Sequence, residues 1–182
     1  MTEPQSNLCT SPEFRELYNV SGANGCLMIR PSIFRIQCAP WVVIGGPYPM
    51  CPPGVFGVCL LEQTPDASKD GFLHLPIRDF STPTRDCDVS DALKCTIEHL
   101  LVGRPVYVGC AAGWGRTGLF LSLLAKVAGE GDPVGFVRRN YACQAVETPE
   151  QSDYIDQFKV AGLRLWLVWK LLLVQQKRRF FQ

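Results

Sequence analysis

The sequence predicts an α/β domain with a central, mostly parallel sheet flanked by helices. Short apolar runs of strand length alternate with longer segments of helical periodicity, an order typical of parallel sheets covered by helices. The 182 residues are 47% hydrophobic and 19% charged, an ordinary globular mix with enough apolar side chains for a core. The length is close to that of a single domain.

Five segments are expected to form the short strands, and glycine and proline separate them. Gly45-Gly46-Pro47 predicts a turn, and the Pro- and Gly-rich stretch Pro47–Gly54 predicts a loop. The runs of strand length are Phe34–Cys38, Trp41–Ile44, Val55–Leu61, Phe72–Leu75 and Pro105–Val108.

Helical periodicity begins near Ser90, a suitable N-cap, and Leu93, Ile97 and Leu100 then share one face. Gly103 is expected to end this helix. Three more helices are expected over Thr117–Val127, from Asp132-Pro133 to near Tyr141, and from the capping box Thr148-Pro149-Glu150-Gln151 onward.

Charge and cysteine content exclude several functional classes. Lys and Arg total 18 and Asp and Glu total 17, so no nucleic-acid partner is expected. The nine cysteines contain no C-x-x-C pair and there are two histidines, so no metal or other cofactor is expected. Reduced thiols and the lack of a secretory signal or a run of about 20 apolar residues predict a cytoplasmic protein.

The loop after the last predicted strand carries the chemistry. Cys110 ends that strand, and Arg116 follows after five residues at the start of a helix. Such a turn points successive backbone N–H groups into one concavity that binds anions, and the helix N-terminus adds positive potential. The guanidinium of Arg116 can hold two phosphate oxygens. Gly113 and Gly115 allow the close backbone approach that this geometry needs.

The same positive field favours the thiolate form of Cys110, which places a nucleophile beneath a bound phosphate. A buried structural cysteine beside an ordinary glycine turn is the alternative interpretation. The complete string Cys-x-x-Gly-x-Gly-Arg-Thr-Gly, with a strand before it and a helix after it, is much more specific than Cys-x5-Arg alone and favours the functional interpretation.

The segment from Val106 to Gly118 resembles the signature loop of the cysteine-dependent protein tyrosine phosphatase superfamily, in its dual-specificity branch, and the similarity in order and spacing extends from Trp41 to Phe158. The resemblance implies metal-independent hydrolysis of phosphate monoesters through a cysteinyl-phosphate. It implies that Cys110 is the nucleophile and that Thr117 stabilises the thiolate as leaving group. The phosphate-binding residues that it implies are Ala111, Ala112, Gly113, Trp114, Gly115 and Arg116.

A general acid must protonate the leaving oxygen. Asp79 lies in a segment that resembles the mobile acid loop of the family, with one helix and one strand before Cys110. It is preferred over Asp86, Asp88 and Asp91, since acidic residues near a helix start can simply offset the helix dipole. A solvated loop carboxylate is the alternative for Asp79.

Two further positions each have both a functional and a structural interpretation. Gln151 matches the place where related enzymes have a glutamine that orients the hydrolytic water, yet it is also the third residue of a capping box. Trp114 is expected at the rim of the site, where it could contact an aromatic substrate, and a core anchor is its alternative.

Gly109 departs from the family pattern, which has histidine immediately before the cysteine. A weakened enzyme or a phosphate-binding pseudophosphatase is therefore an alternative function. Restoring histidine there is expected to change the reactivity of the thiol or the rate. The loop interior carries no lysine, which disfavours a highly charged lipid headgroup as substrate. An RNA 5′-phosphatase of the same chemistry is a third option, and the near-neutral charge gives it little support.

The sequence thus predicts a phosphatase of phosphorylated proteins, acting on phosphotyrosine and also on phosphoserine or phosphothreonine. Residues 1–25 are expected to be a loosely ordered lead-in, 26–160 the phosphatase domain and 161–182 a hydrophobic and basic helix. Apolar residues lie on nearly all sides of that helix. This is more apolar surface than packing of one helix face against a small domain would bury. We therefore expect self-association or contact with a membrane surface through Leu163–Phe181, and a location that is peripheral to a membrane in the second case. The alternative is that this helix simply packs on the domain as part of its core, with the basic end solvated.

Overall fold

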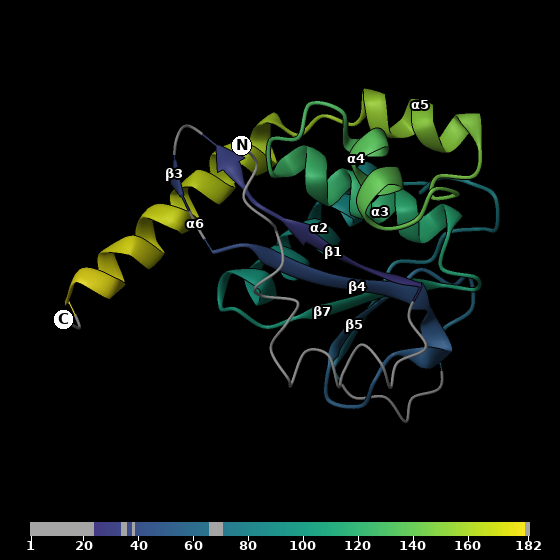
Figure 1. Cartoon of the computed structure of the whole chain (residues 1–182), viewed down its shortest axis with the longest axis horizontal. Coiled ribbons are helices and arrows are strands. Elements are labelled where there is room, and N and C mark those ends of the chain that lie inside the picture. Colours follow the sequence, from purple (N-terminus) through teal and green to yellow (C-terminus); the bar gives the residue numbers. More distant parts are fainter. Residues whose placement is uncertain (1–23, 34–35, 38, 66–70, 181–182) are drawn as a thin grey trace.

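A computed structural model describes residues 24–33, 36–37, 39–65 and 71–180 of the chain. Its centre is a five-stranded sheet in the order β1-β4-β7-β5-β6. Figure 1 shows α3, α4 and α5 gathered over one side of this sheet, while α6 runs outward toward the C-terminal end. The main apolar core lies between that side of the sheet and the helices.

The sheet is mostly parallel, as the sequence predicts. Strand β7 lies in the middle and is parallel to β4 and β5, β5 is parallel to β6, and only β1 is antiparallel to its neighbour β4. The strands of this sheet are β1 (Gly25–Ile29), β4 (Trp41–Pro47), β5 (Phe56–Cys59), β6 (Phe72–His74) and β7 (Val106–Cys110). A separate hairpin consists of β2 (Ser32–Ile33) and β3 (Ile36–Gln37).

The N-terminal part differs from the sequence-based expectation. Gly25–Ile29, for which no strand was predicted, forms the edge strand β1, because its alternating side chains can bury one face against β4. The turn predicted at Gly45-Gly46-Pro47 is wrong, since these residues continue β4 and pair with β7. Of the predicted strand Phe34–Cys38, the described residues Ile36–Gln37 form β3. Its other positions lie outside the described residues, as does the predicted lead-in up to residue 23.

The predicted helices are present with shifted ends. The first begins four residues before Ser90, because Asp86 and Asp88 fit the positive N-terminal turn and Val89 is buried. The caps expected for the third and fourth predicted helices are formed, since Asp132 accepts from the Gly135 N–H and Thr148 from the Gln151 N–H. The helices are η1 (Tyr48–Met50), α2 (Asp86–Leu101), α3 (Gly115–Val127), α4 (Pro133–Asn140), α5 (Pro149–Gln157) and α6 (Ala161–Phe180).

Helices α5 and α6 are separated by a break that Lys126 stabilises. Its ammonium, near the end of α3, donates to the carbonyls of Ile155, Asp156 and Phe158 at 2.6, 2.8 and 3.1 Å, which satisfies acceptors that a helix end leaves open. The inner side of α6 then packs into the main core. No helix in the described part of the chain is long and apolar enough to span a bilayer.

Candidate active site

The loop with the signature residues begins at the carboxyl end of the central strand. Strand β7 is hydrogen-bonded on both sides, so its end is fixed, and Cys110 is its last residue and only 2% exposed. Four residues separate it from Gly115, the first residue of α3. The predicted arrangement of strand, loop and helix N-terminus is therefore present, and the thiol lies at the bottom of the loop.

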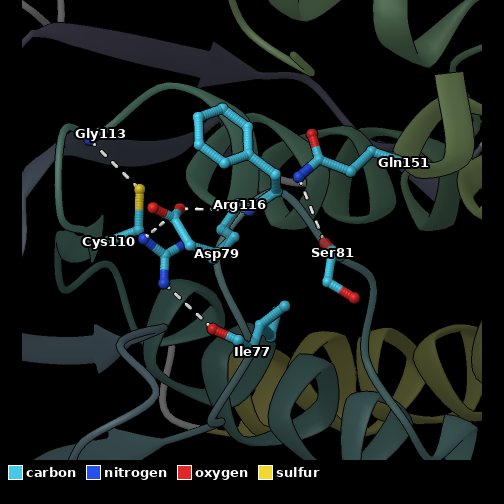
Figure 2. A network of polar contacts seen from close by, with 8 residues as sticks. Ile77, Asp79, Ser81, Cys110, Gly113, Arg116 and Gln151 are labelled. Carbon is cyan, nitrogen blue, oxygen red and sulfur yellow. Dashed lines mark hydrogen bonds and ion pairs between the residues drawn. The ribbon is translucent and has the colours of Figure 1, made fainter. Parts of the chain in front are cut away.

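The loop turns a backbone amide toward the thiol. The Gly113 N–H donates to the Cys110 Sγ over 3.2 Å (Figure 2). Gly113 has a φ of +83°, and a Cβ there would lie 2.7 Å from the Cα of Gly46. Only glycine can take this conformation at such close approach.

Two residues that the sequence analysis missed hold the loop from outside. The Asn24 side-chain amide donates to the carbonyl of Ala112, and the Tyr141 hydroxyl donates to that of Gly113, both over 2.6 Å. A carbonyl held outward leaves the adjoining N–H of the peptide facing inward. Trp114 is half-buried, with its ring 6.4 Å from that of Tyr141, so it packs on the loop and also has an exposed part.

Arg116 is buried in the first turn of α3 and reaches the loop after β6. It is 5% exposed, its Nη1 donates to the carbonyl of Ile77 over 3.0 Å, and its Nη2 lies 2.7 Å from the Asp79 Oδ1 (Figure 2). The structure therefore brings the predicted acid directly to the predicted phosphate-binding arginine.

Asp79 occupies the tip of a tight turn. The Ser81 N–H donates to the carbonyl of Arg78 over 3.1 Å, so Asp79 and Phe80 are the two central residues. Phe80 has a φ of +52°, which is uncommon for a bulky residue, and is 64% exposed. The Asp79 side chain is itself 62% exposed, so the carboxylate contacts Arg116 and also faces solvent.

The other three aspartates considered as acids have different partners. Asp86 accepts from the Tyr154 hydroxyl over 2.8 Å, Asp88 lies 3.6 Å from Arg85, and Asp91 pairs with Lys94 at 3.1 Å. All three belong to α2, and no described contact joins them to Arg116. Across the described ranges, no three His, Cys, Asp or Glu side chains gather where they could hold a metal ion.

Comparison with known proteins relates this site to phosphatases. Residues 64–130 match the model of the DSP-PTPase phosphatase of polymorphic toxin systems. The crystal structure of Tk-PTP in its active form is 25% identical, with a TM-score of 0.52 over 57% of this chain and 77% of that one. In this segment and in its fold, the chain is similar to dual-specificity-like protein tyrosine phosphatases. DUSP15, at 13% identity and a TM-score of 0.59 over 84% of this chain and 96% of that one, shares the fold.

Two proteins of Methanocaldococcus jannaschii, both described as uncharacterized, are also similar to this chain. They are 39% and 36% identical to it over 88 residues, which is 47% of this chain in each case. The match spans 58% of the first relative and 54% of the second, so the chain covers little more than half of their length.

Gln151 connects the loop that carries Asp79 to α5. It is fully buried, its Oε1 accepts from the Glu147 N–H over 3.0 Å, and its Nε2 donates to the carbonyl of Ser81 over 3.2 Å. The threonine half of the capping box is formed, since the Thr148 hydroxyl accepts from the Gln151 N–H. The Gln151 side chain binds the N–H of Glu147 instead of that of Thr148, and it also holds the loop that carries Asp79 (Figure 2).

Thr117 is fully buried behind the loop. Its hydroxyl makes no hydrogen bond with any described residue, so the contact with Cys110 that the family resemblance implies is not formed in this structure. A buried hydroxyl without a partner is uncommon in proteins. The Thr117 hydroxyl is thus an available donor next to the loop.

The structure explains why glycine replaces the family's histidine at position 109. A Cβ on Gly109 would lie 2.7 Å from the Cα and 2.8 Å from the N of Tyr48, and 2.9 Å from the carbonyl oxygen of Gly46. These are backbone atoms that continue β4, so they cannot move as a flexible side chain would. Histidine at this position requires a displacement of β4, whatever it does to the thiol.

We expect Gly109→Ala to lower the free energy of unfolding by about 1–3 kcal/mol, because an added methyl group in a packed interior forces the backbone apart. Gly109→His is expected to lower it further. Urea unfolding measures the effect. Gly131→Ala is the matched control, since nothing lies within 4 Å of a Cβ there. Equal unfolding midpoints for Gly109→Ala and Gly131→Ala would show that β4 and β7 are not packed this closely.

Proposed function

We propose that this chain hydrolyses phosphate monoesters through a cysteinyl-phosphate formed on Cys110. The observation that carries the proposal is the meeting of three groups at one loop: the Cys110 thiol with the Gly113 N–H on its sulfur, and Arg116 paired with Asp79. A nucleophile, an anion-binding group and a proton donor are the minimum that this reaction requires.

In the first step the Cys110 thiolate attacks phosphorus. The S–P bond forms while the bond from phosphorus to the ester oxygen breaks, and Asp79 gives its proton to that oxygen as it leaves. In the second step a water attacks the cysteinyl-phosphate, its proton passes to the Asp79 carboxylate, and inorganic phosphate leaves. The thiolate is regenerated, so no metal ion or redox partner enters the balance.

Binding of phosphate exchanges the partner of Arg116. In this structure the Ile77 carbonyl accepts from Nη1 and the Asp79 carboxylate pairs with Nη2. A phosphate on the loop takes the place of Asp79 with two of its oxygens. The Asp79 side chain, mostly exposed at the tip of its turn, is then released beside the leaving group.

The rim of the site supports phosphorylated proteins as substrates, with phosphotyrosine among them. Phe80 is held next to the acid with its ring exposed, and Trp114 is half-buried on the loop. Aromatic side chains at such positions favour a phenyl ester over a small alkyl ester. Phosphoserine and phosphothreonine remain in the proposed range.

Turnover of p-nitrophenyl phosphate in the presence of EDTA tests the proposal, followed by peptides with phosphotyrosine, phosphoserine or phosphothreonine and by 5′-triphosphorylated RNA. Release of phosphate from the aryl ester and from phosphotyrosine peptide is expected. Binding of tungstate without any turnover would instead identify a pseudophosphatase. Preference for the RNA would instead identify the chain as an RNA 5′-phosphatase.

Asp79→Asn is expected to slow phosphotyrosine hydrolysis by roughly 100-fold or more, because the leaving oxygen loses its proton donor. Hydrolysis of an aryl phosphate with an activated leaving group should fall much less, and the alkaline limb of the pH–rate profile should flatten. Asp91→Asn, also an exposed aspartate with a basic partner, is the control. An equal loss on both substrates would assign Asp79 to binding or folding instead.

A further inference from the structure

Helix α6 has two apolar sides, and the domain covers only one of them. Leu163, Leu167 and Leu171 are buried in the main core. With about 3.6 residues per turn, the opposite side carries a second apolar set. We call it the outer face, and it consists of Leu165, Trp169, Leu172 and Leu173, which are between 38% and 66% exposed. Figure 1 shows α6 extending away from the body of the domain.

The C-terminal segment that contains α6 differs in net charge from the rest of the chain. The segment 157–182 contains six Lys or Arg and no Asp or Glu, although the whole chain has 18 basic and 17 acidic residues. The remainder therefore carries more acidic than basic residues, and the helix that bears the outer face is cationic. Such an asymmetry within one chain is a sign of a charged partner.

Two of the six cations are already engaged by the domain. Arg164 donates to the carbonyl of Lys126 over 2.7 Å, and Lys170 pairs with Glu98 at 2.6 Å. The cations that follow the outer face along α6 are Lys177, Arg178 and Arg179. Leucine and tryptophan with a basic segment adjoining them are the combination that an interfacial membrane helix uses.

A second copy of the chain fits the outer face less well than an anionic lipid surface does. A stable dimer takes about 20–30 residues from each subunit, whereas the outer face has four large side chains on about two turns. Two such helices would also bring like charges together. A lipid surface needs no matching shape, and its acidic headgroups complement the cations.

We propose that α6 docks this chain on a membrane surface that contains acidic lipids, with the outer face inserted among the lipids and the acidic headgroups attracted by the basic sequence Lys177-Arg178-Arg179 that follows it. The helix lies along the surface and does not cross the bilayer. Neither a few apolar side chains nor a few cations suffice alone for stable attachment, so the two contributions act together and the binding is reversible.

This docking leaves the Cys110 loop accessible. Arg164 of α6 contacts the carbonyl of Lys126, in the last turn of α3, whereas the loop adjoins the first residue of α3. The length of α3 therefore separates the two, about 20 Å for its 13 residues. The docked helix and the proposed phosphatase site thus lie at opposite ends of α3.

Co-sedimentation of the full chain with vesicles tests the proposal. Vesicles of phosphatidylcholine with about 30% phosphatidylserine should bind the chain, pure phosphatidylcholine should bind it weakly, and added salt should release it. Changing Lys177, Arg178 and Arg179 to Gln should lower the partition coefficient roughly 100-fold, since each basic residue near such a surface contributes about fivefold. A blue shift of tryptophan emission on binding should be lost in Trp169→Ser.

The double variant Leu165→Ser with Trp169→Ser removes apolar contact without opening the core, as both residues are exposed. It should weaken binding at least roughly tenfold, whereas Val102→Ser, exposed on another part of the domain, should not. Deletion of the helix is unsuitable, because its inner side belongs to the core. Equal binding to neutral and acidic vesicles, no binding to either, or a dimer in sedimentation velocity that the double variant abolishes would each overturn the proposal.

Discussion

Cys110→Ser is expected to abolish phosphatase turnover, with a loss of roughly 10⁴-fold or more, while tungstate binding persists. Serine has nearly the shape of cysteine, and its oxygen can accept from the Gly113 N–H as the sulfur does. Its hydroxyl is not ionised at neutral pH, however, so it provides no nucleophile for the attack on phosphorus. Release of phosphate from p-nitrophenyl phosphate and calorimetric titration with tungstate measure the two effects.

Cys143→Ser is the matched control, since Cys143 is an exposed cysteine and no described hydrogen bond joins it to the loop. It should retain the activity of the parent chain. Turnover by Cys110→Ser at the parental rate would exclude the cysteinyl-phosphate and leave the loop as a site of binding. Loss of turnover together with loss of tungstate binding would show that the substitution disturbs the loop itself.

Arg116→Lys is expected to lower kcat/KM by roughly 10²–10⁴-fold and, unlike Cys110→Ser, to weaken tungstate binding as well. The guanidinium is buried and makes two contacts at once: Nη1 donates to the Ile77 carbonyl, and Nη2 pairs with Asp79. A single ammonium can occupy one of these positions, so it loses either its anchor or the anion that it holds.

Steady-state kinetics with Arg139→Lys as control separates this effect from a general loss of positive charge. Arg139 is exposed and pairs with Asp132 at 3.0 Å. Its replacement should therefore change neither kcat/KM nor the dissociation constant for tungstate. If Arg116→Lys binds tungstate as tightly as the parent chain, the anion is held by backbone amides alone. The proposed exchange of Asp79 for phosphate would then be wrong.

The part of the site that could be predicted from the sequence is the part that is local in the chain. Cys110, Gly113 and Arg116 lie within one strand, loop and helix start, and their spacing alone predicts how they meet. Asp79 is distant in sequence, and it was found through a family resemblance rather than a rule of spacing. Its contact with Arg116 could not be foreseen, since it depends on how the acid loop packs against α3.

The supports of the loop could not be predicted, because they come from elsewhere in the fold. Asn24 precedes the edge strand β1 and Tyr141 follows α4, yet both donate to carbonyls of one loop. Nothing in their local sequence distinguishes them from surface residues. The turn expected at Gly45-Gly46-Pro47 was wrong for a related reason. A Cβ on Gly45 would lie 2.6 Å from the ring of Tyr141, and the backbone of Gly46 lies close to Gly109 and Gly113. These contacts arise only once the sheet and the loop are assembled.

The acid loop is attached on both sides of its tip. The Ile77 carbonyl is held by Arg116 and the Ser81 carbonyl by Gln151, so the segment with freedom to change shape is reduced to Arg78, Asp79 and Phe80. Ordering a backbone residue costs about 1–2 kcal/mol. In the proposed reaction only three residues have to be ordered over the substrate, so their ordering uses a small part of the free energy of substrate binding. More of that free energy is then available to lower the barrier of the chemical step.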